Sequence, residues 1–125
     1  MTRESESLEE AHTLTLTDQD FLKKISFFIE ENIANQELEV YHIVRHMAMS
    51  RSVLYSKFKA ITRQGVNEFI RLIKLRKSKE LLRTSSMSIN EIADAVGFNS
   101  ASYFIRCFVK EYQITPTEFR GSKKQ

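Results

Sequence analysis

The amino-acid sequence predicts an all-α fold of seven helices. Apolar residues recur with the 3.6-residue period of an α-helix along most of the 125 residues, and nowhere with the two-residue period of a strand. One proline and three glycines leave long stretches without a helix breaker. In two places Ser or Thr precedes such a stretch, with Glu three positions later, which is the capping box that begins a helix.

The first helix follows an acidic N-terminus. Residues 1–17 are rich in Glu, Ser and Thr, and we interpret them as a linker ahead of a domain over residues 18–125. The segment TDQD, residues 17–20, resembles a capping arrangement, and apolar side chains from Phe21 to Ile33 then fall on one side.

Three helices are expected next. A short helix fits residues 40–47. Ser50 caps the following helix, which ends near Thr62. Gly65 precedes a long helix over residues 66–83, which would measure about 27 Å.

The last three helices begin at capping sequences. SINE, residues 88–91, is a capping box that opens a short helix up to Val96. Ser100 begins the next helix, which extends to about residue 112. TPTE, residues 115–118, combines a capping box with proline at the first helical position, where its missing N–H costs nothing.

Residues 40–125 contain one pattern twice. Each copy has a short helix, a tight turn and a longer helix, which is the plan of a helix-turn-helix. We place the first at about residues 40–62 and the second at about residues 88–112, with the long helix between them. The matching residues are Val40, Ile43, Met47, Ser50, Ser52, Leu54 and Phe58 in the first copy and Ile89, Ile92, Val96, Ser100, Ser102, Phe104 and Phe108 in the second.

Each longer helix has an apolar side and an outer side. At about 100° per residue, Phe104 and Phe108 share one side, whereas Ser102 and Arg106 lie nearly opposite. The same arithmetic turns four residues of the first copy outward or to the edge: Ser52, Tyr55, Ser56 and Lys59. An outer Arg or Lys is often only solvated, but two copies in one register favour a shared DNA-reading role.

The charge distribution agrees with a polyanionic partner. The net charge is +3, but residues 1–40 carry −7 and residues 41–125 carry +10. The alternative is a solvated helical surface with a chance imbalance. The single cysteine excludes an internal disulfide and fits a reducing cytoplasm, and no apolar run approaches the ~18 residues of a membrane span.

The segments "YHIVRHMAMSRSVLYSKFKAITRQGVNEFIRLIKLRKSKELL" and "INEIADAVGFNSASYFIRCFVKEYQITPTEFR" resemble the DNA-binding domain of the AraC/XylS family of bacterial transcription regulators. The resemblance covers residues from about 18 to 120. It implies two helix-turn-helix units on a long linker helix, binding to asymmetric promoter sites and, usually, activation of transcription, with RNA polymerase as a further partner. It also implies the following base-reading positions: Arg51, Ser52, Tyr55, Ser56, Ala101, Ser102, Ile105 and Arg106.

Helix N-termini and outer cations predict the phosphate contacts. The candidates are Ser50, Lys59, Arg71, Lys74, Ser100 and Lys110. A linker helix of about 27 Å is close to the ~34 Å of one turn of B-DNA, so it could set both reading helices into successive major grooves. The alternative for cations on the linker helix is that they lay their stems over the core.

More narrowly, "FLKKISFFIEENI" followed by "MSRSVLYSKFKAIT" resembles the C-terminal domain of hybrid two-component sensor-regulators. The acidic start would then connect to a receiver or sensor domain. The family commonly has glycine at the positions of Arg63 and Gln113. These two residues imply mild strain or a different turn, and Gly65 could replace the first glycine.

Other features of the sequence give weaker indications of function. His42 and His46 have the spacing of metal ligands on a helix but lack a third ligand, and Cys107 is expected to be a small core residue rather than a redox sensor. No nucleophile or phosphate-loop motif indicates an enzyme. We expect a cytoplasmic, monomeric regulator that binds double-stranded promoter DNA, without cofactor or membrane contact. The alternatives are a helical protein-interaction module and a nonspecific DNA-binding protein.

Overall fold

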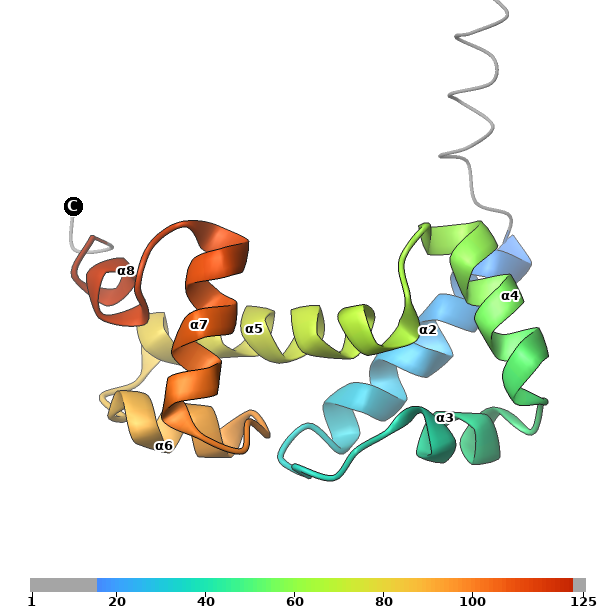
Figure 1. Cartoon of the computed structure of the whole chain (residues 1–125), viewed down its shortest axis with the longest axis horizontal. Helices are drawn as coiled ribbons and strands as arrows, with labels where there is room; N and C mark the ends of the chain where they lie inside the picture. The colour runs from blue at the N-terminus through green and yellow to red at the C-terminus, as the bar shows by residue number, and fades with distance from the viewer. Residues whose placement is uncertain (1–15, 123–125) are drawn as a thin grey trace, which may run out of the picture.

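Two three-helix units lie at the ends of one long helix. The computed structural model describes residues 16–122, and its elements in that range are all helices (Figure 1). This confirms the all-α prediction. The seven helices are α2 (Leu16–Glu31), α3 (Val40–Met47), α4 (Arg51–Thr62), α5 (Val66–Thr84), α6 (Ile89–Ala95), α7 (Ala101–Tyr112) and α8 (Pro116–Ser122).

Each unit has its own hydrophobic core, and α5 contributes to both. The first core joins α2, α3 and α4 to the N-terminal half of α5 around Leu54 and Phe58, which are both fully buried. The second joins α6, α7 and α8 to the C-terminal half of α5 around Phe104 and Phe108. Ile33 packs against both cores.

The predicted caps form at four helix starts. Ser50 Oγ accepts a hydrogen bond from Val53 N at 3.2 Å, and Ser100 Oγ accepts one from Tyr103 N at 3.1 Å. Ser88 and Thr115 form capping boxes with Glu91 and Glu118. These bonds satisfy backbone N–H groups that a helix leaves unpaired at its start, so they fix where each helix begins.

The N-terminal boundary differs from the prediction. Among the described residues α2 begins at Leu16, so Thr17 and Asp18 lie inside the helix instead of capping it. Asp18 in the first turn still stabilises the helix through its dipole. Residues 1–15 of the predicted linker lie outside the described residues.

Three helices end at a non-glycine residue in the left-handed conformation. Ala48, Arg63 and Gln113 have φ values of 56°, 64° and 59°. The N–H groups of Arg63 and Gln113 each donate to a carbonyl four residues earlier at 2.8 Å, so the left-handed cap is kept without glycine. Of the two alternatives, strain is therefore the one realised. Gly65 has a φ of −78° and caps the start of α5, so it does not replace the glycine.

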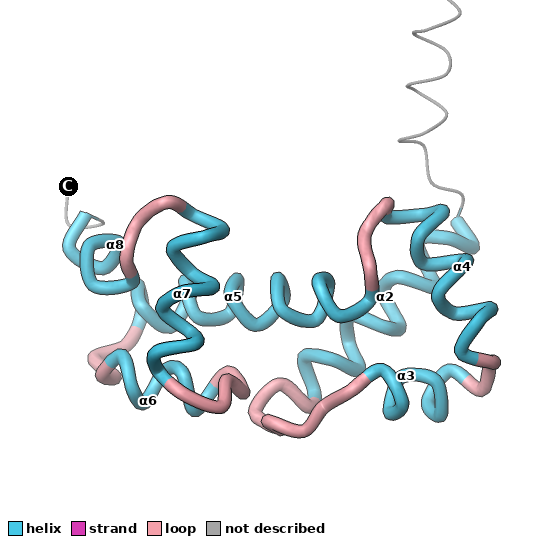
Figure 2. The backbone as a smooth tube through the Cα atoms, in the orientation of Figure 1, coloured by secondary structure: helices cyan, strands magenta, loops and turns pink. Residues whose placement is uncertain are grey.

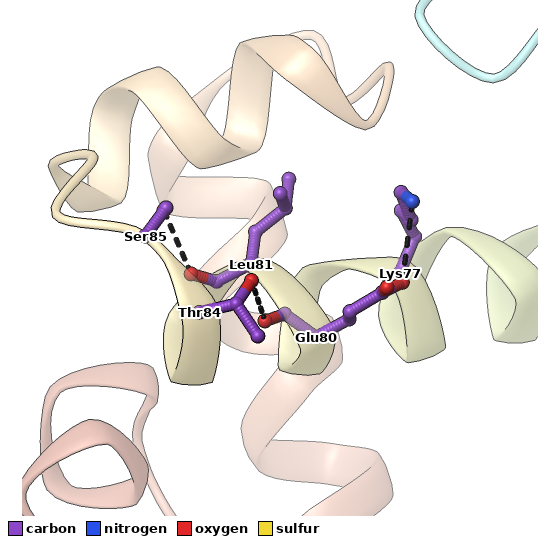
Figure 3. A network of polar contacts seen from close by, with 5 residues as sticks. All are labelled: Lys77, Glu80, Leu81, Thr84 and Ser85. Carbon is purple, nitrogen blue, oxygen red and sulfur yellow. Dashed lines mark hydrogen bonds and ion pairs between the residues drawn. The ribbon is translucent and has the colours of Figure 1, made fainter.

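The C-terminus of α5 is held by polar contacts from several directions. Ser85 Oγ donates to the Leu81 carbonyl and Thr84 Oγ1 donates to the Glu80 carbonyl, both at 2.8 Å (Figure 3). From α8, Arg120 Nε donates to the Leu82 carbonyl at 3.1 Å. These donors satisfy carbonyls that the end of a helix leaves unpaired.

Candidate nucleic-acid interface

The outer side of α4 is built on two buried anchors. Leu54 and Phe58 hold the helix to the first core. Four predicted base-reading residues, Arg51, Ser52, Tyr55 and Ser56, are exposed, as are the predicted phosphate contacts Ser50 and Lys59. The N-terminal half of α4 therefore presents small polar side chains around one arginine and one tyrosine.

The outer side of α7 has the same construction. Phe104 and Phe108 are fully buried and form edge-on contacts with each other at a centroid distance of 5.8 Å. Ser102 and Arg106 are exposed, and Ala101 and Ile105 are half-buried at the edges of the same surface. The predicted phosphate contacts Ser100 and Lys110 are exposed as well.

The two helices run in the same direction. Figure 1 shows α4 and α7 at opposite ends of α5, with their N-terminal ends on the same side of the molecule. The 19 residues of α5 span about 28 Å, compared with the ~34 Å pitch of B-DNA. The arrangement therefore places two similar helices, which run in the same direction, at the two ends of α5.

A tyrosine orients the arginine on each of these surfaces. Arg51 lies over the ring of Tyr55 at 5.9 Å, and its Nη1 donates to the Tyr55 hydroxyl at 3.3 Å. Arg106 lies over the ring of Tyr103 at 5.6 Å. Tyr103 is 39% exposed, so part of its ring lies on the same outer surface as Arg106. Both guanidinium groups are thereby held near the helix surface.

Sequence reasoning missed Tyr103 and a third pair on α3. Arg45 Nη1 donates to the Tyr41 hydroxyl at 2.8 Å, and this bond raises the pKa of the guanidinium. Both Tyr41 and Arg45 are exposed. The available signal was a Tyr–Arg spacing of four residues on α3 and of three residues on α7, which brings the two side chains into contact on one helix face.

An open groove of about 930 Å³ separates α7 from the N-terminal half of α5. It brings together four predicted contact residues, Arg71, Ile105, Arg106 and Lys110. The carboxylates of Glu68 and Glu111 also line the groove, so its charge is mixed. Arg71 is half-buried and stays within reach of the surface.

Lys74 corrects the predicted set of phosphate contacts. The residue is only 8% exposed, and its Nζ donates to the Gly97 carbonyl at 2.9 Å. Burial lowers the pKa of the ammonium below its ordinary value. The prediction that Lys74 contacts phosphate is therefore wrong, because its charged group points into the protein. The alternative, a stem laid over the core with the charged head in water, does not describe Lys74 either, because its ammonium is buried on the Gly97 carbonyl.

The residues set aside in the sequence have structural partners. His42 Nδ1 accepts a hydrogen bond from Glu39 N at 3.0 Å and so caps α3, while the His46 ring stacks on Phe28 at 4.3 Å. Cys107 is half-buried against the second core. Across residues 16–122 no three side chains of the His, Cys, Asp or Glu type are placed to hold a metal ion. None of the helices in that range is long and apolar enough to cross a bilayer.

Comparison with known proteins gives the same picture at the level of family. A family model described as a helix-turn-helix domain matches residues 43–122. Histidine kinase P4 of Formosa agariphila is 36% identical over 109 residues, which make up 87% of this chain but 8% of that protein. This chain spans less than a third of the length of several curated relatives.

Two solved structures share the fold over most of their length. An AraC-type transcriptional regulator from Chromobacterium violaceum is 28% identical, with a TM-score of 0.80 over 89% of this chain and 98% of that chain. The C-terminal domain of the two-component response regulator yesN from Fusobacterium nucleatum is 30% identical, with a TM-score of 0.73 over 81% of this chain and 98% of that chain.

Proposed function

Because the chain belongs to the AraC/XylS helix-turn-helix family of DNA-binding transcription regulators, we propose that it places α4 and α7 in successive major grooves of one promoter duplex. The observation that carries this proposal is the pair of similar outer surfaces, which run in the same direction at the two ends of α5. A rod of about 28 Å suits two contacts on one face of B-DNA.

Base reading combines two arginines with small side chains. Arg51 and Arg106 can each donate two hydrogen bonds to guanine O6 and N7. Ala101, Ile105 and the serines suit close approach and contact with thymine methyl groups. Because few of these side chains can make bidentate contacts, the shape of the DNA contributes a large share of the specificity.

Phosphate contacts orient the domain on the duplex. The proposed set is Ser50, Lys59, Arg71, Ser100 and Lys110, without Lys74. Ser50 and Ser100 already accept a backbone N–H, and their hydroxyl hydrogens remain able to donate to a phosphate oxygen.

The proposal extends to the protein that contains this domain. The match to a small part of a histidine kinase and the likeness to the C-terminal domain of a response regulator support an output module linked to a receiver or sensor domain. In this role the domain acts in the bacterial cytoplasm as an activator that contacts RNA polymerase, and it performs no catalysis.

A selection from random double-stranded DNA tests the proposal. Residues 16–122 should enrich a bipartite motif whose half-sites lie about ten base pairs apart. Binding without a motif would identify a nonspecific DNA-binding protein, and no enrichment would favour the protein-interaction alternative. A promoter carrying the motif, placed before a reporter gene, then separates activation from repression.

A further inference from the structure

The two three-helix units touch each other directly, beside the linker helix. The loop between α2 and α3 faces the turn between α6 and α7 near the middle of the molecule (Figure 2). Gln36 Nε2 in this loop donates to Asp94 Oδ1 on α6 at 2.9 Å. Ile33, just after α2, packs against both cores. The second unit is therefore tied to the first by contacts outside α5.

Gly97 allows this close approach. Its φ is +86°, which L side chains rarely adopt, and a Cβ at this position would collide with the Ile33 carbonyl oxygen. The same Cβ would lie 3.2 Å from Lys74 Nζ. The backbone of the α6–α7 turn can therefore rest on the backbone after α2 only because residue 97 has no side chain.

Lys74 joins the linker helix to this contact. Its buried ammonium donates to the Gly97 carbonyl and lies 5.8 Å from the centre of the Phe98 ring. The ion pairs within residues 16–122 do not include Lys74. A buried charge is costly unless it is hydrogen-bonded, so the lysine favours the one arrangement in which the Gly97 carbonyl faces α5.

We propose that Lys74 is a positioning residue that fixes the angle between the two units and thereby determines which half-site spacing the domain accepts. This inference rests on the proposed DNA binding. Two linked reading helices strengthen each other only when both can engage at once. If the junction between the two units is rigid, the gain in DNA affinity is large at one half-site spacing and small at others. If the junction is loose, the gain is spread over several half-site spacings.

Lys74→Met tests the proposal because it keeps the length of the side chain and removes its hydrogen-bond donors. Affinities are measured for duplexes whose half-sites are about nine to thirteen base pairs apart. For the wild type we expect one preferred spacing, favoured about tenfold or more over a spacing two base pairs longer. For Lys74→Met we expect a preference of about threefold or less. Lys23→Met, which removes an exposed charge from α2, should keep the wild-type profile.

A second measurement needs no DNA. Spin labels at residues 60 and 111, in a Cys107→Ser background, report the distance between α4 and α7. We expect a narrow distribution for the wild type and for Lys23→Met, and a broader or displaced one for Lys74→Met. Gln36→Ala, which alters the exposed rim of the same contact, should change the distribution in the same direction by a smaller amount. It also serves as the test variant if Lys74→Met does not fold.

The outcomes separate this inference from the proposed function. An unchanged distance distribution in folded Lys74→Met would overturn the positioning role, whatever the domain binds. A broader distribution with an unchanged spacing preference would overturn the link to specificity. If the wild type selects no DNA motif, the proposed function fails while the distance measurement still decides whether Lys74 fixes the junction.

Discussion

At the scale of single residues, the two arginines proposed to read bases are partly ordered in the free protein. Immobilising a long side chain at an interface costs about 0.5–1.5 kcal/mol. An exposed cation–π contact offsets about 0.5–1 kcal/mol of that cost in the free protein. In the proposed interface, Tyr55 and Tyr103 therefore act on DNA affinity through Arg51 and Arg106, even where the rings themselves touch no base.

The first prediction concerns Arg106. Replacing it by alanine should weaken binding to the selected site by more than about tenfold, or about 1–3 kcal/mol, if the guanidinium makes a bidentate contact. Arg106→Lys keeps the charge but loses the planar fork, so it should lose specificity more than overall affinity. Fluorescence anisotropy with selected and scrambled duplexes measures both quantities. A footprint identical to that of the wild type would remove Arg106 from the interface.

The second prediction concerns backbone strain at Ala48. This exposed residue ends α3 with a φ of 56°. Ala48→Gly should raise the free energy of unfolding by about 1 kcal/mol because glycine adopts this conformation without a Cβ clash. Ala60→Gly, the same change inside α4, should lower it by about 1 kcal/mol. Urea unfolding measures both variants, and equal signs would contradict the strain argument.

At the scale of elements, the side-chain contacts that stabilise helix ends and turns are of two kinds, some between neighbours in the sequence and some between distant residues. The capping serines lie three residues from the N–H groups that they accept, so the sequence alone predicted these helix starts. The two contacts of Arg120 with the end of α5 join residues 38 and 35 positions apart, and the contact of Lys74 with Gly97 joins residues 23 positions apart. The local sequence pattern does not predict contacts between such distant residues, so it indicates a phosphate contact for Lys74 that the structure contradicts. The helical period does predict which residues of α4 and α7 lie on the outer side, and these are exposed or half-buried in the structure.

The third prediction concerns the end of the linker helix. Arg120 donates to the carbonyls of Leu82 and Ser85, where the negative end of the α5 dipole favours a cation. Arg120→Met should lower the free energy of unfolding by about 1–2 kcal/mol because it leaves partly buried carbonyls unpaired. Arg76→Met, at an exposed position of α5, should change it by no more than about 0.5 kcal/mol. If the two variants unfold alike, Arg120 is not a cap.

At the scale of the whole molecule, the positive charge lies in the same part of the chain as the helix-turn-helix units. The positive excess belongs to residues 41–125, which also contain both helix-turn-helix units and the linker helix. Such a distribution attracts a duplex before any specific contact forms. Affinity should then depend steeply on ionic strength, because each phosphate contact releases condensed counterions.

The fourth prediction puts this dependence into numbers. With roughly five phosphate contacts, affinity should fall by several hundredfold between about 50 and 200 mM salt. Lys59→Ala should reduce the slope of log affinity against log salt by about 1. Lys23→Met, on the outer side of α2, should leave the slope unchanged. A flat response of the wild type would contradict the phosphate-contact set.

Ile33 affects whether one half of the domain could be exchanged for that of a relative. Each half of the domain has its own core, so the two halves could in principle be exchanged between relatives by recombination. Because Ile33 packs against both cores, a half taken from a relative would not be shaped to pack against Ile33 and the other core. Exchanging one half for that of a relative should therefore disturb the packing around Ile33 in both units.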